Sequence, residues 1–422
     1  MTKDTFLLLA ATLALSGCLI GPEVEREEKD DYGALYPFPQ AKTFNGTIKP
    51  SNRTQIRLNG DIEEKYREYK NKYLAKTDKG RRYIKATGTN ESAAAATISE
   101  AHGYGMIIFA LMAGHDKDAK TIFDGMNTFR KAHRSRINND LMSWTVFTED
   151  LDAEAGMAKN QNTSATDGDL DISYALLLAY KQWGDAKYLS EARTLIDAIK
   201  KSNIHGACMR TALGDWNTWN WGSSSVVTDR NTSRSSDWMM GHFRAFAAAT
   251  NDNFWLEVAD TAYSVLRQVS NQNTGLVSCF INGIPPRPDP NAGGTGEQNG
   301  QHYWSNACRV PWRLATDYAH YSTPEAKEQI DKISAWLRSS TRENTGSIKQ
   351  GYQLDGTPIS NNSASPMYTA PFAAGMIANT NNQTFLNDLY ASVRQTNAGE
   401  AYNAAIQLLC MLLISGNWWP PY

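Results

Sequence analysis

The sequence lacks features that would divide the chain or require covalent cross-links. Its 422 residues contain only five cysteines, and no low-complexity seam separates one half from the other. We therefore expect one large domain rather than several small ones. The four cysteines beyond Cys18 lie far apart and match no zinc-binding spacing, which predicts mostly buried free thiols with room for one disulfide.

The sequence also lacks an excess of charge of either sign. Lysine and arginine total 42 while aspartate and glutamate total 44, which gives a formal net charge of -2. No block of basic residues is present that could follow a phosphate backbone. Nucleic acid is therefore not an expected partner.

The apolar run near the N-terminus, from Phe6 to Leu15, is too short to span a bilayer but has the length of a signal-peptide core. Lys3 precedes this run, and Leu15-Ser16-Gly17-Cys18 resembles a bacterial lipobox. We expect a signal peptide over 1–17, lipidation of Cys18, and export to the bacterial cell envelope, at the outer membrane or cell surface. The alternative is a soluble secreted protein whose cysteine falls there by chance.

The segment after Cys18 is rich in charge and broken by proline. Such a composition does not pack a core, so we expect residues 18–45 to form a flexible tether. The folded domain is then expected over 46–422, as a monomer.

About twelve stretches in this domain show helical apolar spacing. They cover roughly 61–76, 99–113, 117–132, 169–183, 187–201, 236–249, 254–270, 309–320, 324–339, 368–379, 383–394 and 399–415. The even-numbered stretches are rich in Ala, Leu, Ile, Met and Gly, while the odd-numbered stretches carry many charges. Apolar helices surrounded by amphipathic ones predict an all-α (α/α)6 barrel of six inner and six outer helices. Helical bundles and solenoids fit the same rule, but no fixed-period repeat is visible.

Polar clusters open the apolar stretches. The clusters contain Glu100, Asp167 with Asp169, Asp237, Asn306 with Arg309, and Tyr368. If the inner helices run parallel, these clusters meet at one end of the barrel. Each cluster by itself is also explained as a helix cap, but several acids accompanied by glycines and aromatics favour a site that binds and hydrolyses sugars.

Glycoside hydrolysis needs one protonated carboxylic acid and a second carboxylate that attacks or activates water. Glu100 suits the first role if burial or a nearby anion such as Asp167 keeps its proton bound. We expect Gly103 and Gly105 to let the substrate approach the backbone closely. Aromatic rings bind the apolar faces of sugars, and they can also simply plug the barrel mouth. The aromatic candidates are Tyr104, Trp216, Trp219, Trp221, Tyr303, Trp304, Tyr352 and Tyr368.

Five segments carry a resemblance to a known family. They are Ile98-Ser99-Glu100-Ala101-His102-Gly103-Tyr104-Gly105-Met106, the run from Ala165 to Trp183, Arg234-Ser235-Ser236-Asp237-Trp238-Met239, the run from Asn306 to Arg313, and Ser365-Pro366-Met367-Tyr368. Together they resemble glycoside hydrolase family 8 over most of the folded chain. The resemblance implies an (α/α)6 barrel, inversion at the anomeric carbon and no cofactor. It also implies that Glu100 is the proton donor and Asp167 a central carboxylate, with Asp169 a weaker candidate for the same cluster.

One position departs from the commonest family pattern. Many members have an aspartate base where this chain has Asn306, and an amide cannot deprotonate water. A subgroup with chitosanases and lichenases resembles this chain and takes its base from a glutamate in an upstream loop. That resemblance implies Glu297 as the base, with Asn306 and Arg309 placing the base or the water. The alternative is a solvated loop glutamate in an altered or inactive enzyme.

The expected function is therefore an inverting endo-β-1,4-glycosidase acting on β-glucan, either cellulose-type or mixed-linkage β-1,3-1,4-glucan. A chitosanase of the same family is the close alternative, and xylan fits the aspartate-base relatives better. A non-catalytic surface lipoprotein that captures glycans is an alternative from another class. A polysaccharide lyase would need a base such as His102 or Tyr104.

Overall fold

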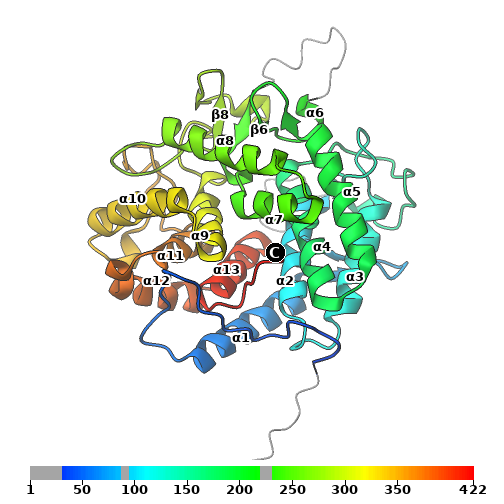
Figure 1. Cartoon of the computed structure of the whole chain (residues 1–422), viewed down its shortest axis with the longest axis horizontal. Helices are drawn as coiled ribbons and strands as arrows, with labels where there is room; N and C mark the ends of the chain where they lie inside the picture. Colours follow the sequence, from blue (N-terminus) through cyan, green and yellow to red (C-terminus); the bar gives the residue numbers. More distant parts are fainter. Residues whose placement is uncertain (1–30, 87–94, 219–230) are drawn as a thin grey trace, which may run out of the picture. The chain divides into compact units, whose positions relative to one another are not determined.

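The computed structural model describes residues 31–86, 95–218 and 231–422. Twelve longer helices and one short helix form within this part of the chain (Figure 1). The inner helices are α2 (Ser99–Leu111), α4 (Thr166–Trp183), α7 (Met240–Thr250), α9 (Val310–Tyr321), α11 (Pro366–Met376) and α13 (Ala401–Ile414). The outer helices are α1 (Gln55–Tyr73), α3 (Ala119–Ala132), α5 (Ala186–Ser202), α8 (Phe254–Val269), α10 (Pro324–Thr341) and α12 (Gln383–Gln395). The short helix is α6 (Asp215–Thr218).

The inner helices close into a ring. Each contacts the next in chain order, and α13 returns to contact α2. Each outer helix packs on an inner one, for example α3 on α2 and α5 on α4, and Figure 1 shows the outer helices at the periphery. This arrangement confirms the expected (α/α)6 barrel.

Burial explains which helices lie inside. Every residue of α2 from Ala101 to Leu111 is buried, whereas α3 buries one face, including Ile122, Phe123 and Met126. A helix apolar on all sides has to be surrounded, and an amphipathic helix covers it. The alternation in the sequence therefore predicted the two layers correctly.

Gly103 and Gly105 serve the packing of the helices. A Cβ atom on Gly103 would lie 2.8 Å from Asp171 Cβ of α4, and one on Gly105 would lie 2.6 Å from Ile84 Cγ1. We expected these glycines to admit substrate, and that expectation is wrong, because both face neighbouring protein. They let α2 approach its neighbours closely.

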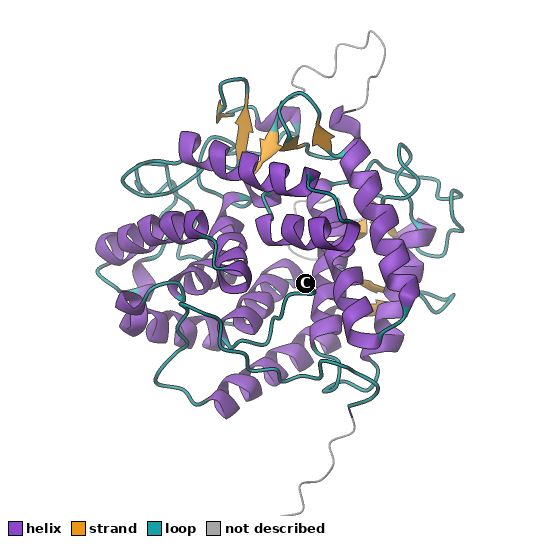
Figure 2. Cartoon of the chain, in the orientation of Figure 1, coloured by secondary structure: helices purple, strands orange, loops and turns teal. Residues whose placement is uncertain are grey.

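The strands are short and lie in the connections between helices (Figure 2). β3 (Ala95–Ile98) pairs with β4 (Thr145–Phe147), and β7 (Ser233–Arg234), β8 (Phe280–Asn282) and β9 (Arg287–Pro288) form a three-stranded sheet. The remaining hairpins join β1 (Leu74–Lys76) to β2 (Arg82–Ile84) and β5 (Ile204–His205) to β6 (Arg210–Thr211). None of the helices in the described ranges is both long and apolar enough to cross a bilayer.

The segment from Asp31 to Asn45, expected to be part of the tether, packs against the barrel instead. Phe38 is buried, and the ring of Tyr36 stacks on Trp419 at 4.6 Å. The backbone N–H of Leu35 donates to the carbonyl of Gln182 in the last turn of α4, and those of Phe38 and Lys42 donate to the carbonyls of Ala113 and Gly416, just beyond the ends of α2 and α13. The last carbonyls of a helix lack partners within the helix, so an extended segment with free N–H groups satisfies them. The folded domain therefore includes residues before 46.

The four cysteines in the described ranges are free thiols, and three of them, Cys279, Cys308 and Cys410, are buried. This confirms the expectation of mostly buried free thiols. Cys18 lies outside the described residues.

Candidate active site

The starts of the inner helices bring together residues that are far apart in the sequence. Glu100 lies in the first turn of α2 and Asp167 in the first turn of α4. Asp237 ends a short turn of 3-10 helix before α7, and Arg309 ends another directly before α9. Four of the predicted polar clusters therefore meet at one end of the barrel.

Arg309 is the centre of this cluster. Its Nη1 contacts Glu100 Oε1 and lies 3.1 Å from both Asp167 Oδ2 and the Tyr104 hydroxyl. The Tyr104 hydroxyl donates to Glu100 Oε1 at 3.1 Å. Arg309 Nη2 donates to the Asn306 side-chain oxygen at 2.7 Å and to Ser236 Oγ at 3.0 Å. One guanidinium thus holds groups from α2, from α4 and from the turn before α7.

Glu297 joins the cluster through Asn306. The Asn306 side-chain nitrogen donates to Glu297 Oε2 at 2.6 Å, and Arg234 Nη2 donates to Glu297 Oε1 at 3.0 Å. Both carboxylate oxygens are therefore held, and the glycine-rich loop that carries Glu297 is closed onto the cluster.

Exposure separates the acids into two groups. The Glu100 and Glu297 side chains are 12% and 35% exposed, so both are accessible from solvent. Asp167 and Asp237 are buried. Burial raises the pKa of Asp167, Arg234 opposes this change, and Asp171 reinforces it. Burial and the nearby Asp167 raise the pKa of Asp237 well above its ordinary value.

Several predicted site residues lie elsewhere. Asp169 points away from the cluster, where it accepts from Met142 N and the Asn203 side chain at 3.3 and 3.1 Å. Tyr303 and Tyr368 are fully buried, so neither ring presents a face to a ligand in this structure. Trp216 is half-buried in α6. Trp219 and Trp221 lie outside the described residues.

Sequence reasoning missed the two arginines that complete the charge balance, Arg234 and Arg313. Both stood inside the family-like segments but were not assigned a role. A signal was available, because several acids predicted to meet in one interior require buried cations of comparable number.

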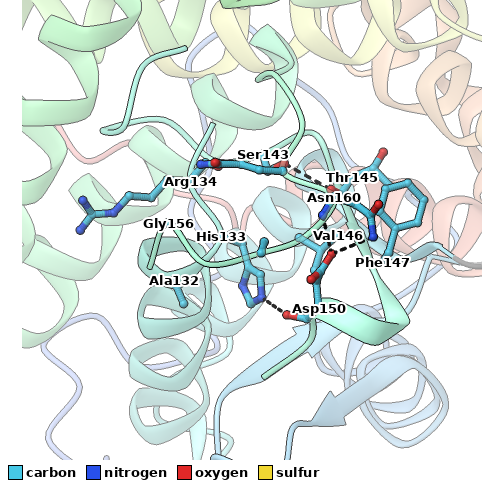
Figure 3. Close-up of a pocket in the computed structure, with 12 residues that line it drawn as sticks. Ala132, His133, Arg134, Ser143, Thr145, Val146, Phe147, Asp150, Gly156 and Asn160 are labelled. Carbon is cyan, nitrogen blue, oxygen red and sulfur yellow. Dashed lines mark hydrogen bonds between the residues drawn. The ribbon is translucent and has the colours of Figure 1, made fainter. Parts of the chain in front are cut away.

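The pocket in Figure 3 is a separate feature. It lies in the connection between α3 and α4 and is lined by residues that include His133, Ser143 and Asp150 (Figure 3). His133 Nε2 contacts the Asp150 carbonyl oxygen at 2.9 Å, and the Asp150 carboxylate accepts from the backbone N–H groups of Lys159 and Asn160. These polar groups are used in holding the loop, and none of the acids of the cluster lines this pocket.

No group of three or more histidine, cysteine, aspartate or glutamate side chains in the described ranges is arranged to hold a metal ion. The chemistry available to the cluster is that of two accessible carboxylates supported by arginine, amide and tyrosine groups.

Comparison with known proteins agrees with this description. The model of glycosyl hydrolases family 8 matches residues 56–416. An endoglucanase of Bacillus sp. (strain KSM-330) is 39% identical over 92% of this chain and 82% of its own length. A β-glucanase of Niallia circulans is 35% identical over 91% of both chains.

Solved structures give the same result. The apo structure of a β-1,3-1,4-glucanase from Paenibacillus sp. X4 superposes with a TM-score of 0.83 at 34% identity, covering 91% of this chain and 99% of that one. Rex8A from Paenibacillus barcinonensis, complexed with xylose, shares the fold with a TM-score of 0.68 at 18% identity, covering 88% of this chain and 97% of that one. Family match, identity and fold together assign the chain to glycosyl hydrolases family 8, and the protein is a glycoside hydrolase.

Proposed function

We propose that this enzyme is an inverting endo-glycosidase that hydrolyses β-1,4 bonds in β-glucan, either cellulose-type or mixed-linkage β-1,3-1,4-glucan. The observation that carries the proposal is that the two accessible carboxylates, Glu100 and Glu297, belong to one network through Arg309 and Asn306. The names of the similar proteins, endoglucanase, β-glucanase and β-1,3-1,4-glucanase, support the substrate class.

In the proposed reaction, Glu100 donates its proton to the glycosidic oxygen as the bond from that oxygen to the anomeric carbon breaks. A water molecule attacks the anomeric carbon from the opposite face and transfers a proton to Glu297. Asp167 binds hydroxyl groups of the sugar ring at the cleavage point. Each turnover leaves Glu100 ionised and Glu297 protonated, and both recover by proton exchange with solvent because both are accessible.

Asn306 has the chemistry of a holder for the base. Its amide oxygen accepts from Arg309 while its amide nitrogen donates to Glu297. An ionised aspartate accepts hydrogen bonds and has no donor, so it could not make the second contact. An amide at this position therefore fits a separate base that is supplied by the loop.

Substitution of the two acids tests these roles. With barley β-glucan, Glu100→Gln and Glu297→Gln should each lower kcat by about 1,000-fold. Glu343→Gln is the matched control, because Glu343 is also 35% exposed and also ion-paired to an arginine, Arg338. Proton NMR of the first product should show the α-anomer. A β-anomer, or full turnover by either glutamine variant, would refute the mechanism.

The separation of the two carboxyl groups is a second test. An inverting enzyme requires about 6.5–9.5 Å between acid and base to admit water. We expect the carboxyl groups of Glu100 and Glu297 to show that separation in a crystal structure of the Glu100→Gln variant with a bound glucan oligosaccharide. A complex with Glu297 turned away from the sugar would contradict its role as base.

The choice of glucan over chitosan rests on charge. Chitosan is cationic and calls for free acids along its binding site. Asp215, the acid beside the tryptophans of residues 214–222, is buried and accepts hydrogen bonds from the backbone of Ser164 and Asn138. Reducing ends released from barley glucan, carboxymethylcellulose, xylan and chitosan give the direct answer, and faster release from chitosan would favour the chitosanase alternative.

The same assay tests the alternative of a non-catalytic surface lipoprotein. Glycan binding without hydrolysis by the unmodified protein would indicate such a capture lipoprotein.

Export and lipid anchoring through Cys18 form a separate proposal that rests on the sequence from Leu15 to Cys18. Cells fed radioactive palmitate should label the full chain, while Cys18→Ala should abolish the label and release the protein from membranes. Labelling that persists in Cys18→Ala would reject lipidation at this residue.

A further inference from the structure

A second layer of charged side chains lies one helical turn further into the barrel than the acid cluster, which consists of Glu100, Asp167, Asp237 and Glu297. Asp171 of α4 and Arg313 of α9 form a two-bond ion pair, with Nη1 3.1 Å from Oδ1 and Nη2 2.7 Å from Oδ2. His242 of α7 places Nε2 2.9 Å from Asp171 Oδ1. The three side chains are at most 2% exposed, so they cannot touch a sugar.

We propose that Asp171, Arg313 and His242 are positioning residues that fix the geometry of the proton donor and its neighbours. This inference rests on the roles proposed above for Glu100 and Asp167. It assigns a catalytic effect to a layer that makes no contact with substrate.

The two layers are linked by helical spacing. Asp167 and Asp171 are four residues apart in α4, and Arg309 and Arg313 are four residues apart at the start of α9, so each pair lies on one face of its element, about one turn apart. The ion pairs Arg309–Asp167 and Arg313–Asp171 therefore join the same two elements at successive levels. A shift at the lower level moves the upper one.

The lower layer also supports Glu100. The Arg313 guanidinium lies 5.8 Å from the ring centre of Tyr104, whose hydroxyl donates to Glu100. The α2 backbone meets α4 at Asp171, since a Cβ on Gly103 would lie 2.8 Å from Asp171 Cβ. His242 ties α7 to the same point, and Tyr174 stacks on its ring at 3.9 Å.

The electrostatics explain why the charge of Asp171 matters. Burial alone would raise the pKa of Asp171, but Arg313 and His242 lower it below its ordinary value, so the group is a carboxylate. Without that charge, the Arg313 cation would be buried with no counter-ion. The Arg313 cation also interacts with the charge of Asp167, one turn above. Competition for Asp167 would disturb the pairing with Arg309.

The chain offers a matched control on the same helix. Asp317 of α9 is fully buried, accepts from Arg244 Nε at 2.9 Å and accepts from the Tyr263 hydroxyl at 2.5 Å. Arg244 is on α7 and Tyr263 is on α8, and neither makes any of the contacts described for the acid cluster. Asp317→Asn therefore also neutralises a fully buried carboxylate that pairs with an arginine, here Arg244, which is 25% exposed, one turn further from the reaction.

The experiment compares the full chain with its Asp171→Asn, Asp317→Asn and Glu100→Gln variants on barley β-glucan. Asp171→Asn should lower kcat by about 100-fold with KM changed by less than about three-fold, since small displacements of catalytic groups have effects of that size. Asp317→Asn should lower Tm by about as much as Asp171→Asn lowers it, while its kcat stays within about three-fold of the unmodified enzyme. Equal losses of kcat in the two asparagine variants would overturn the inference.

A second pair of variants covers the case in which Asp171→Asn does not fold. His242→Gln retains an N–H donor near the position of Nε2, whereas His242→Leu removes it. The glutamine variant should keep kcat within about three-fold, and the leucine variant should lose about ten-fold or more. Equal kcat values would overturn the inference. Full turnover by Glu100→Gln would instead reject the proposed function.

Discussion

The two ends of the barrel are built from opposite ends of the same helices and differ in their connections and in their polar groups. At the end where the inner helices begin, long connections supply strands, a glycine-rich loop and the acid cluster. At the end where they finish, connections are short, as between α4 and α5 or α9 and α10, and residues 31–51 cross the helix ends.

The difference follows from the direction of the peptide group. Helix N-termini carry partial positive charge and unpaired N–H groups, which favours the carboxylates Glu100 and Asp167 in first turns. At the opposite end, N–H groups of Leu35, Phe38, Lys42 and Ile48 donate to carbonyl oxygens in the last helical turn or within two residues after it. One end is therefore suited to chemistry and the other to stability, so substitutions at the two ends should affect different measurements.

Arg309→Met should give the largest effect at the catalytic end. It removes the guanidinium that contacts Glu100, Asp167 and Asn306, and we expect kcat to fall by about 1,000-fold. Arg309→Lys keeps the charge but not the fork of donors, so its kcat should lie between those of Arg309→Met and the unmodified enzyme. Steady-state kinetics with barley β-glucan measures both. If Arg309→Met lowered only Tm, the two ends would not differ as argued.

Phe38→Ala should give the largest effect at the opposite end. Phe38 is 1% exposed, and removing a buried phenylalanine costs about 3 kcal/mol of unfolding free energy. Tm should fall while kcat at a temperature well below Tm stays unchanged. Leu35→Ala is the control, because Leu35 lies in the same segment but is 64% exposed. Should Phe38→Ala lower kcat, the end where the inner helices finish would also govern catalysis.

The sequence predicted the helical framework well because buried and covering helices differ in composition. The stretch 166–183 illustrates this, since Tyr174 to Ala179 is buried on all sides without a charged residue, and the stretch forms an inner helix. The same logic placed Glu100, Asp167 and Arg309 together, because parallel inner helices must begin at one end.

The contacts made by connections were harder to predict. Residues 31–45 look like a tether in composition, and the carbonyls near the helix ends and the surface that buries Phe38, both properties of the assembled barrel, explain why they pack. The four residues of α6 are too few for a periodic signal. Tyr303 and Tyr368 belong to the core although tyrosine is equally common at sugar-binding surfaces, and spacing does not distinguish the two environments.

Asp237→Asn should give the smallest effect and sharpens the comparison within the catalytic end itself. Asp237 makes no hydrogen bond to Glu100, Glu297 or Arg309 in the described part of the chain, so we expect kcat and KM to change little, in contrast to Arg309→Met. Its Oδ1 accepts from Ser236 Oγ at 3.0 Å, and the asparagine oxygen would keep that bond. Its Oδ2 has no hydrogen-bond partner in the described part of the chain, with the nearest Arg234 nitrogen at 4.0 Å.

The direction of the pKa shift gives the sign of the stability change. The pKa of Asp237 in the folded protein lies well above the unfolded value of about 3.9, so folding favours the protonated form. The stability this group contributes is present below that unfolded pKa and is lost as pH rises through the folded pKa. Asp237→Asn cannot ionise, so its Tm should match that of the unmodified enzyme near pH 4 and exceed it at pH 8. Calorimetry at the two pH values measures this, and a variant less stable at pH 8 would mean that the ionised carboxylate is needed there.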